Sequence, residues 1–380
     1  MRKSSLNHAY NHLCTCNETH KLQVSNINKA FYINFIIVKH LIQTICIVPF
    51  AFFCMVACKK STIVSLQGKN NSNAPNFYIA GESNGTPCLW INGTKNILST
   101  SNGSAYQILI NGNDIYVTGY YELPATNLNN PGGFVPMQCV YWKNGIENKI
   151  GNIVYGHIPI EPTISIVNNN IYYANGQAWE NGSQLNFNLS NAGIVQMVAS
   201  YGSDIYFVGT DGAGEAAYWK NGLQNNIISN ETRANAAYSL AVSANNLYIG
   251  GADSMSMGTI WTNGIPENLQ LSIPGSYSVS VSSLFAHGTD TYAVAELVAP
   301  TSMSNGNYFD FYTIPAYWKN GIENDLPLNG DSYGNVNTVF VDGSDVYVCG
   351  ETSTGAVYWK NGVETKLGSE YGFVSSILIK

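Results

Sequence analysis

Residues 345–367 read DVYVCGETSTGAVYWKNGVETKL, and this stretch decides the fold. Asp345–Gly350 and Ala356–Lys360 are short runs rich in Val and Tyr, which is typical of β-strands. A further short strand, Val363–Leu367, follows an Asn-Gly pair. This pair indicates a two-residue hairpin turn, because Asn and Gly both tolerate the positive φ angles that such a turn needs. Together with Thr338–Val341 just upstream, the stretch predicts a four-stranded antiparallel meander.

Two marks of this unit recur seven times along the chain. Every tryptophan lies in a Trp-x-Asn-Gly motif, and each motif is preceded by Asp or Asn, any residue, and Tyr. The tryptophans are Trp90, Trp142, Trp179, Trp219, Trp261, Trp318 and Trp359. The tyrosines are Tyr78, Tyr116, Tyr172, Tyr206, Tyr248, Tyr292 and Tyr347. Successive tyrosines are 34 to 56 residues apart, so the chain is built from a repeat of about 40 residues.

Seven meanders in series predict an all-β fold, a seven-bladed β-propeller over residues 76–380. One meander alone is marginally stable, whereas stacking seven around an axis buries both faces of each sheet. We expect the Tyr and Trp columns to fill the gaps between neighbouring blades rather than to stack on a ligand. The first unit starts at its second strand, Asn76–Gly81, and the chain ends on an unpaired first strand, Phe373–Ile379. The C-terminal strand should therefore pair into blade 1 and close the ring.

The motif D-x-Y-x-x-G followed by A-x-Y-W-K-N-G resembles a repeat common in secreted and lipid-anchored proteins of the Bacteroidetes. Its period is similar to that of kelch and WD-repeat propellers. The resemblance covers residues 76–380, and it implies an architecture and a cell-surface location but no catalytic residues. Blade 3 departs from the pattern, because Ala174-Asn175-Gly176 replaces the usual end of the strand.

An export leader precedes the repeats. Residues 41–57 are apolar and follow Lys39, and Met55-Val56-Ala57-Cys58 resembles a bacterial lipobox, so we expect Cys58 to be the lipidated N-terminus. The alternative is a single transmembrane anchor, although the apolar stretch is slightly short for one.

The leader divides the chain further. Residues 1–37 do not resemble a leader. We expect that translation starts near Val38, so that these residues are not part of the protein, or that they form a disordered extension. Residues 38–57 then form the lipoprotein signal peptide, and residues 58–75 form a Ser- and Asn-rich tether. The expected location is the bacterial cell envelope at the outer membrane, with the membrane as a partner through the lipid.

Composition excludes several functions. The chain has 17 basic and 24 acidic side chains, and residues 1–57 contain five of the basic and one of the acidic ones. Residues 58–380 therefore have a net charge of −11, and Arg233 is their one arginine. Nucleic acid is therefore a poor partner. Residues 58–380 contain two histidines, His157 and His287. They are too few for a multi-histidine metal centre or a Ser-His-Asp triad, and we expect no metal and no cofactor. Cys88, Cys139 and Cys349 should be small buried residues.

Function should lie on the face that carries the longer, more variable loops. Insertions occupy this face in blade 2 (Tyr120–Met137) and blade 6 (Glu296–Ile314), and their aromatic and acidic side chains suit a sugar or a protein. The candidate ligand-binding residues are Tyr120, Tyr121, Glu122, Glu296, Tyr308, Phe309, Asp310 and Tyr312. The alternative is that these loops pack on themselves.

An acidic residue also follows the Tyr strand in every blade except the third. These residues are Glu82, Glu122, Asp211, Asp253, Glu296 and Glu351. They could attract a cation or a basic partner, or they could keep the face soluble.

Three functions remain open from the sequence. The leading one is a non-enzymatic, monomeric, lipid-anchored propeller that binds a glycan or a protein. The second is an enzyme acting on polysaccharide, with Glu122, Glu296 and Asp310 as acid and base, which requires two carboxyls roughly 5–10 Å apart across one cleft. The third is a purely structural component of the envelope.

Overall fold

The computed structural model describes residues 76–124, 135–151, 153–155, 161–187, 193–229, 232–273, 276–300, 303–304, 307–308 and 311–380. The predicted extension, signal peptide and tether, including Cys58, lie outside these residues. All regular structure in the described ranges is β-strand, and none of it is a helix long and apolar enough to cross a membrane.

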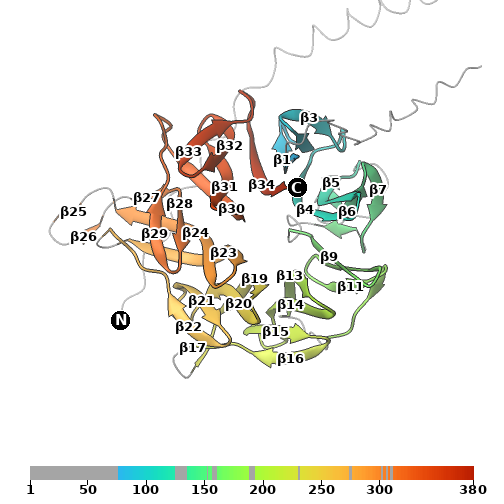
Figure 1. Ribbon diagram of the computed structural model, residues 1–380, viewed down its shortest axis with the longest axis horizontal. Helices are drawn as coiled ribbons and strands as arrows, with labels where there is room; N and C mark the ends of the chain where they lie inside the picture. The colour runs from blue at the N-terminus through green and yellow to red at the C-terminus, as the bar shows by residue number, and fades with distance from the viewer. Residues whose placement is uncertain are drawn as a thin grey trace, which may run out of the picture. The chain divides into compact units, whose positions relative to one another are not determined.

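The described strands form seven antiparallel sheets arranged in a ring, as predicted (Figure 1). Each sheet is a blade whose first strand is innermost and whose fourth strand is outermost. Blade 1 consists of β34 (Gly372–Ile379), β1 (Phe77–Ser83), β2 (Thr86–Ile91) and β3 (Thr94–Ile97). Blade 2 consists of β4 (Gly103–Asn111), β5 (Asp114–Glu122), β6 (Pro136–Lys143) and β7 (Ile146–Lys149), with β8 (Val154–Tyr155) also paired to β6. Blade 3 consists of β9 (Thr163–Val167), β10 (Asn170–Ala174), β11 (Ala178–Glu180) and β12 (Ser183–Gln184).

The other four blades repeat this order. Blade 4 consists of β13 (Ile194–Tyr201), β14 (Asp204–Thr210), β15 (Ala216–Lys220) and β16 (Leu223–Asn226). Blade 5 consists of β19 (Ala236–Ser243), β20 (Asn246–Ala252), β21 (Gly258–Thr262) and β22 (Ile265–Asn268). Blade 6 consists of β23 (Tyr277–His287), β24 (Asp290–Pro300), β28 (Ala316–Lys319) and β29 (Ile322–Asp325), with β27 (Phe311–Ile314) also paired to β24. Blade 7 consists of β30 (Gly334–Asp342), β31 (Asp345–Thr352), β32 (Gly355–Lys360) and β33 (Val363–Lys366). Two short ribbons, β17–β18 (Ile228–Ser229 and Thr232–Arg233) and β25–β26 (Met303–Ser304 and Asn307–Tyr308), lie in connections.

The C-terminal strand closes the ring. β34 pairs antiparallel with β1 along its whole length, from Phe77 opposite Ile379 to Ser83 opposite Gly372, and the two strands lie side by side in Figure 1. The backbone of Asn76 exchanges two further hydrogen bonds with Lys380. The first blade is thus completed by the last residues of the chain, as the phase of the repeat predicted.

Large side chains fill the junctions between blades. Within the described part of the chain each of the seven junctions has its own apolar cluster, and in six of them the Trp of one blade shares the cluster with the Tyr of the preceding blade. Trp142, for example, packs with Tyr78, and Trp359 packs with Tyr292. The tryptophans thus pack in the junctions between blades. Cys88, Cys139 and Cys349 are also buried free thiols, as expected.

The asparagine of each Trp-x-Asn-Gly turn ties together the two repeated motifs. In blade 7, Asn361 has a φ of 49°, its Oδ1 accepts the Val346 N–H at 2.8 Å, and its Nδ2 donates to Asp345 Oδ1 at 2.8 Å. The same pair of bonds recurs in the other blades that the structure describes, at Asn92, Asn144, Asn181, Asn221, Asn263 and Asn320. The first residue of the Asp/Asn-x-Tyr motif is therefore the hydrogen-bond acceptor for the side chain of the turn asparagine.

A β-bulge interrupts the innermost strand at one repeated position. In five blades, by the registers of the described strands, the ladder shifts opposite the glycine that stands three residues after the repeated Tyr. A Cβ built on Gly209 would lie 1.9 Å from the Ile194 carbonyl oxygen, and one on Gly350 would lie 1.9 Å from that of Asn335. Gly in D-x-Y-x-x-G is thus required because the bulge turns a backbone carbonyl onto it.

Polar bonds join the innermost strands around the axis. At every junction of the described ring, a side chain on one innermost strand bonds to the innermost strand of the next blade. The pairs are Ser375 with the Ala105 carbonyl, Gln107 with the Ile164 N–H, Thr163 with the Val198 N–H, the Met197 sulfur with the Leu240 N–H, Ser239 with the Val281 carbonyl, Ser283 with Thr338, and Asn337 with the Val374 carbonyl. The seven bonds form a belt inside the apolar junctions.

Candidate functional site

The two ends of the blades differ. The turns from first to second strand and from third to fourth strand are tight and alike, and they form what we call the constant-turn face. The loops from second to third strand and the connections between blades form the variable face. Both insertions belong to the variable face, because each follows the second strand of its blade.

Two of the expected acidic residues brace loops of the variable face instead of lining an open rim. Asp253 is fully buried, and its Oδ1 accepts the N–H groups of Met255 and Met257 at 2.8 and 2.9 Å. Asp211 is likewise buried and accepts the N–H groups of Ala213 and Glu215. In blades 4 and 5 the acidic side chain at this position of the repeat therefore serves its own loop, which sequence position alone does not reveal.

The candidates in blade 2 fold back on the protein. Tyr120 is half-buried and stacks on Tyr106, with ring centroids 6.0 Å apart. Tyr121 donates its hydroxyl to Glu147 Oε1 at 2.9 Å, and burial together with this carboxylate raises the pKa of Tyr121 to about 12. Glu122 accepts an N–H from the Asn102 amide at 3.1 Å.

The candidates in blade 6 differ in how much of each residue the structure describes. Phe309 and Asp310 lie outside the described residues, and Tyr308 is described only as backbone of β26. Tyr312 lies in β27 with 45% of its surface exposed. Glu296 is exposed in β24, and its carboxylate has no hydrogen-bond partner in the described part of the chain.

Glu296 lines a pocket of about 370 Å³ between blades 6 and 7. Its lining includes Glu351 from β31 as a second carboxylate. The uncharged polar lining residues are Ser280, Ser282, Thr313, Asn335 and Asn337, and the apolar ones are Ala295, Leu297, Ile314 and Val336, with Gly334 at the end of β30. No basic or aromatic side chain belongs to this described lining, so the pocket offers hydrogen-bond acceptors, amides and hydroxyls above small apolar groups.

The pocket forms where blade 6 departs from the repeat. Ala295 stands three residues after Tyr292, at the position where five other blades have glycine. The ladder between β23 and β24 accordingly shifts twice, between Ser278 and Val281 and again between Val281 and Ser283. The two shifts fall in the part of the inner strand where Ser280 and Ser282 line the pocket. A local departure from a repeated rule is where a functional site is expected.

Glu351 is held in place, whereas Glu296 is not. The Glu351 carboxylate accepts from Asn335 Nδ2 at 3.0 Å and from Asn337 Nδ2 at 3.4 Å. Asn337 also donates to the Val374 carbonyl at 2.9 Å, which links this network to the strand that closes the ring. The pocket thus combines one fixed and one free acceptor.

Of the polysaccharide-cleaving set inferred from the sequence, Asp310 lies outside the described residues. Glu122 lies in blade 2 and Glu296 in blade 6, and neither of the two pockets described in this section includes both. Glu351 is the carboxylate that shares a pocket with Glu296. In the same described ranges no three metal-ligating side chains lie together as a possible metal site.

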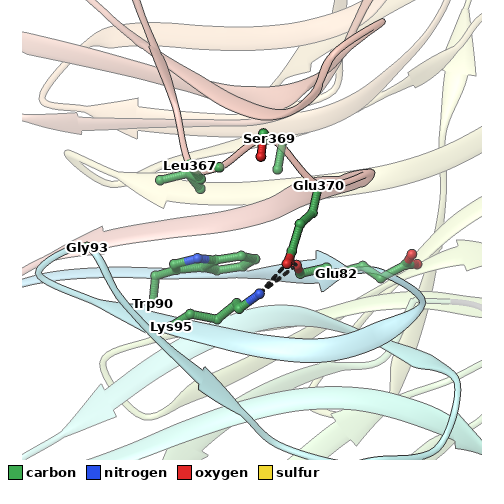
Figure 2. A pocket seen from close by; sticks show the side chains of 10 residues that line it. Glu82, Trp90, Gly93, Lys95, Leu367, Ser369 and Glu370 are labelled. Carbon is green, nitrogen blue, oxygen red and sulfur yellow. Dashed lines mark hydrogen bonds and ion pairs between the residues drawn. The ribbon is translucent and has the colours of Figure 1, made fainter.

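A second pocket of about 250 Å³ lies at the closure between blades 7 and 1. Figure 2 shows Lys95 reaching toward Glu370 beside the Trp90 ring, with an ion pair of 2.5 Å between them. Ser83 donates to the same Glu370 oxygen at 2.6 Å. Because these polar groups satisfy one another, this pocket serves closure better than ligand binding.

The fold defines the class of this protein, a closed seven-bladed β-propeller, and its junction between blades 6 and 7 holds a pocket. No protein-family model matches the chain, and no curated protein matches its sequence.

Three similar solved structures illustrate the architecture. Apo AztD from Citrobacter koseri is 11% identical with a TM-score of 0.37, over 81% of this chain and 98% of that one. The WD40 β-propeller domain of Doa1 is 13% identical with a TM-score of 0.33, over 58% and 86%. Trypanosoma rangeli sialidase in complex with sialic acid is 10% identical with a TM-score of 0.30, over 81% and 54%. At these values no function is transferred.

Proposed function

We propose that this chain is a lipid-anchored binding module of the bacterial cell envelope, and that it takes a glycan in the pocket between blades 6 and 7. The observation that carries the proposal is the Glu296 carboxylate, which has no hydrogen-bond partner among the described residues and lies in a pocket whose other polar groups are the Glu351 carboxylate, amides and hydroxyls. Such groups exchange hydrogen bonds with sugar hydroxyls, while two carboxylates without a basic neighbour disfavour anionic ligands. We therefore expect neutral or cationic sugars rather than acidic ones.

A glycan array probed with the full-length exported protein tests this function. The expected result is binding of a neutral or amino-sugar glycan, weakened at least about tenfold by Glu296→Gln, which is the size of one lost charged hydrogen bond. Glu122→Gln is the matched control, because it changes the equivalent acid in blade 2, and it should leave binding unchanged. Equal loss in both variants, or capture of a protein and no glycan, would contradict the proposal.

A second candidate is hydrolysis of the same glycan, favoured by Glu296 and Glu351 lining one pocket. Two carboxyls across a cleft are the machinery of glycoside hydrolysis. Release of reducing sugar that is lost in both Glu296→Gln and Glu351→Gln would support this reading. Binding without turnover would support the binding module.

The location is proposed from the leader. Lipid on Cys58 should place the protein in the outer-membrane fraction, consistent with the resemblance to lipid-anchored Bacteroidetes repeats. Cys58→Ser is expected to release the protein into the soluble fraction, as followed by fractionation and by intact mass. An unchanged mass and an unchanged membrane fraction would contradict lipidation.

A further inference from the structure

One exposed apolar feature repeats around the ring. The residue directly after the Asn-Gly turn, at the start of the outermost strand, is a branched aliphatic side chain in blades 2, 4, 5, 6 and 7. These residues, here called the aliphatic rim, are Ile146, Leu223, Ile265, Ile322 and Val363, with 57%, 75%, 73%, 59% and 68% of their surfaces exposed. Thr94 and Ser183 occupy the position in blades 1 and 3.

The rim lies on the constant-turn face, since each of its members follows a third-to-fourth strand turn. Isolated exposed aliphatic residues are ordinary, but five at one end of a ring form a repeated apolar edge. Nothing inside the described ring covers them, so they are accessible to a surface outside the ring.

The chain itself joins the ring on this face. Asn76 precedes β1, and its side chain accepts a hydrogen bond from Asn92, the turn residue of blade 1, at 3.0 Å. Residues 59–75 separate Cys58 from this point and span at most about 60 Å when fully extended. The more compact this segment is, the smaller the distance between the constant-turn face and a lipid on Cys58.

The charged pairs at the turns are compatible with the same orientation. On the constant-turn face Lys143, Lys220, Lys319 and Lys360 each pair with an aspartate, so those charges cancel. The variable face carries the carboxylate of Glu296, which has no hydrogen-bond partner among the described residues and which an anionic membrane surface repels.

We propose that the aliphatic rim rests on the surface of a lipid bilayer, so that the variable face and its pocket point away from the membrane. Exposed Ile, Leu and Val side chains suit the boundary between headgroups and acyl chains. The inference rests on the proposed lipidation of Cys58, and it adds a defined orientation to it.

Single cysteine labels test the orientation in the full-length lipidated protein. Vesicles of phosphatidylethanolamine and phosphatidylglycerol would carry Ile265→Cys or Leu223→Cys, each labelled with a polarity-sensitive dye. Ile97→Cys is the matched control, because Ile97 is also exposed, at 52%, but lies at the other end of an outermost strand. The native Cys88, Cys139 and Cys349 are buried, and unsubstituted protein measures any background labelling.

We expect a blue shift of emission and quenching by spin-labelled lipid at positions 265 and 223, and neither effect at position 97. A lipidated chain with equal signals at both ends, or with the shift at position 97, would overturn the orientation alone. A dimer that buries the labels without vesicles would also overturn it. A chain that neither carries lipid on Cys58 nor binds vesicles would overturn both proposals.

Discussion

At the scale of single residues, the turn asparagine forms hydrogen bonds that link two motifs across 10 to 30 residues of sequence. Its positive φ was predictable from the Asn-Gly pair, because that dipeptide has few other uses between strands. Its hydrogen bonds were not, since their acceptors and donors sit on a strand whose register is known only after folding. Conformation and bonding can be separated by substitution.

Asn144 provides that separation. Asn144→Gly keeps the positive φ but removes the bonds to the Ile115 N–H and to Asp114, so the free energy of unfolding should fall by about 1–2 kcal/mol. Asn144→Ala loses the same bonds and adds strain at a φ of 51°, which should cost about 1 kcal/mol more. Urea unfolding measures both variants. Equal stability of Asn144→Gly and the unsubstituted protein would show that the side-chain bonds contribute nothing.

The bulge glycine makes a second residue-scale prediction. Gly209→Ala places a Cβ 1.9 Å from the Ile194 carbonyl oxygen, and the inner strand must move, so we expect a loss of about 3 kcal/mol. Gly202→Ala is the control, at a φ of 60° with no atom within 4 Å, and should cost about 1 kcal/mol. Thermal and urea unfolding should rank the two in that order. The opposite ranking would mean that the bulge relaxes freely.

At the scale of strands, the sequence predicted strand identity better than strand irregularity. Asp345–Gly350 was expected as a strand, and β31 spans Asp345–Thr352. The bulge opposite it was not expected, because alternation of side chains shows that a strand exists but not where its ladder slips. The repeated glycine was the available signal.

The residue after the repeated Trp and the first residue of the tyrosine motif vary together from blade to blade. Where the turn reads Trp-Lys-Asn-Gly the tyrosine motif begins with Asp, and where Lys is absent it begins with Asn. The structure gives the reason, because each such lysine pairs with its aspartate and lies 5.2–5.3 Å from the centre of the repeated Tyr ring. The pair holds the second and third strands together at the constant-turn face.

Exchanging one pair for the neutral spelling tests this coupling. Asp345→Asn and Lys360→Thr together convert blade 7 to the residues of blade 5. The loss of unfolding free energy in the double variant should be smaller than the sum of the losses in the two single variants. The hydrogen bond from Lys360 lowers the pKa of Asp345, so this stabilisation is complete above the unfolded pKa near 3.9 and is lost as the pH falls through the lower folded value. Melting temperature against pH should therefore fall less steeply in acid for Asp345→Asn. Parallel curves would contradict the pairing.

At the scale of the whole molecule, the number of blades and the closing strand followed from counting motifs. The candidate site followed only in part. Glu296 was identified from its place after the Tyr strand, but Asn335, Asn337, Ser280 and Ser282 were not. These residues belong to two blades and meet only when the blades stack, and the replacement of glycine by Ala295 was the one sequence sign of an altered junction.

Closure is the prediction that belongs to this scale. Deletion of residues 372–380 removes the inner strand of blade 1 together with the buried Val374 and Ile377, so cooperative unfolding should be lost. Val374→Asp tests the same point at full length, because an unpaired charge at a fully buried site should lower stability by about 3 kcal/mol or more. Val363→Asp, at the exposed rim, is the control and should melt normally. Unchanged melting of the deletion variant would show that the ring does not depend on β34.

Because β34 pairs with β1, a strand made after all the other strands of the ring completes the sheet made first. A nascent polypeptide still held by the ribosome therefore exposes the free inner edge of β1, however much of the remainder has folded. Premature termination anywhere upstream leaves that edge permanently open to other chains, and such edges promote aggregation. Quality control by proteolysis would thus act on every truncated product alike, and only a fully translated chain would escape it.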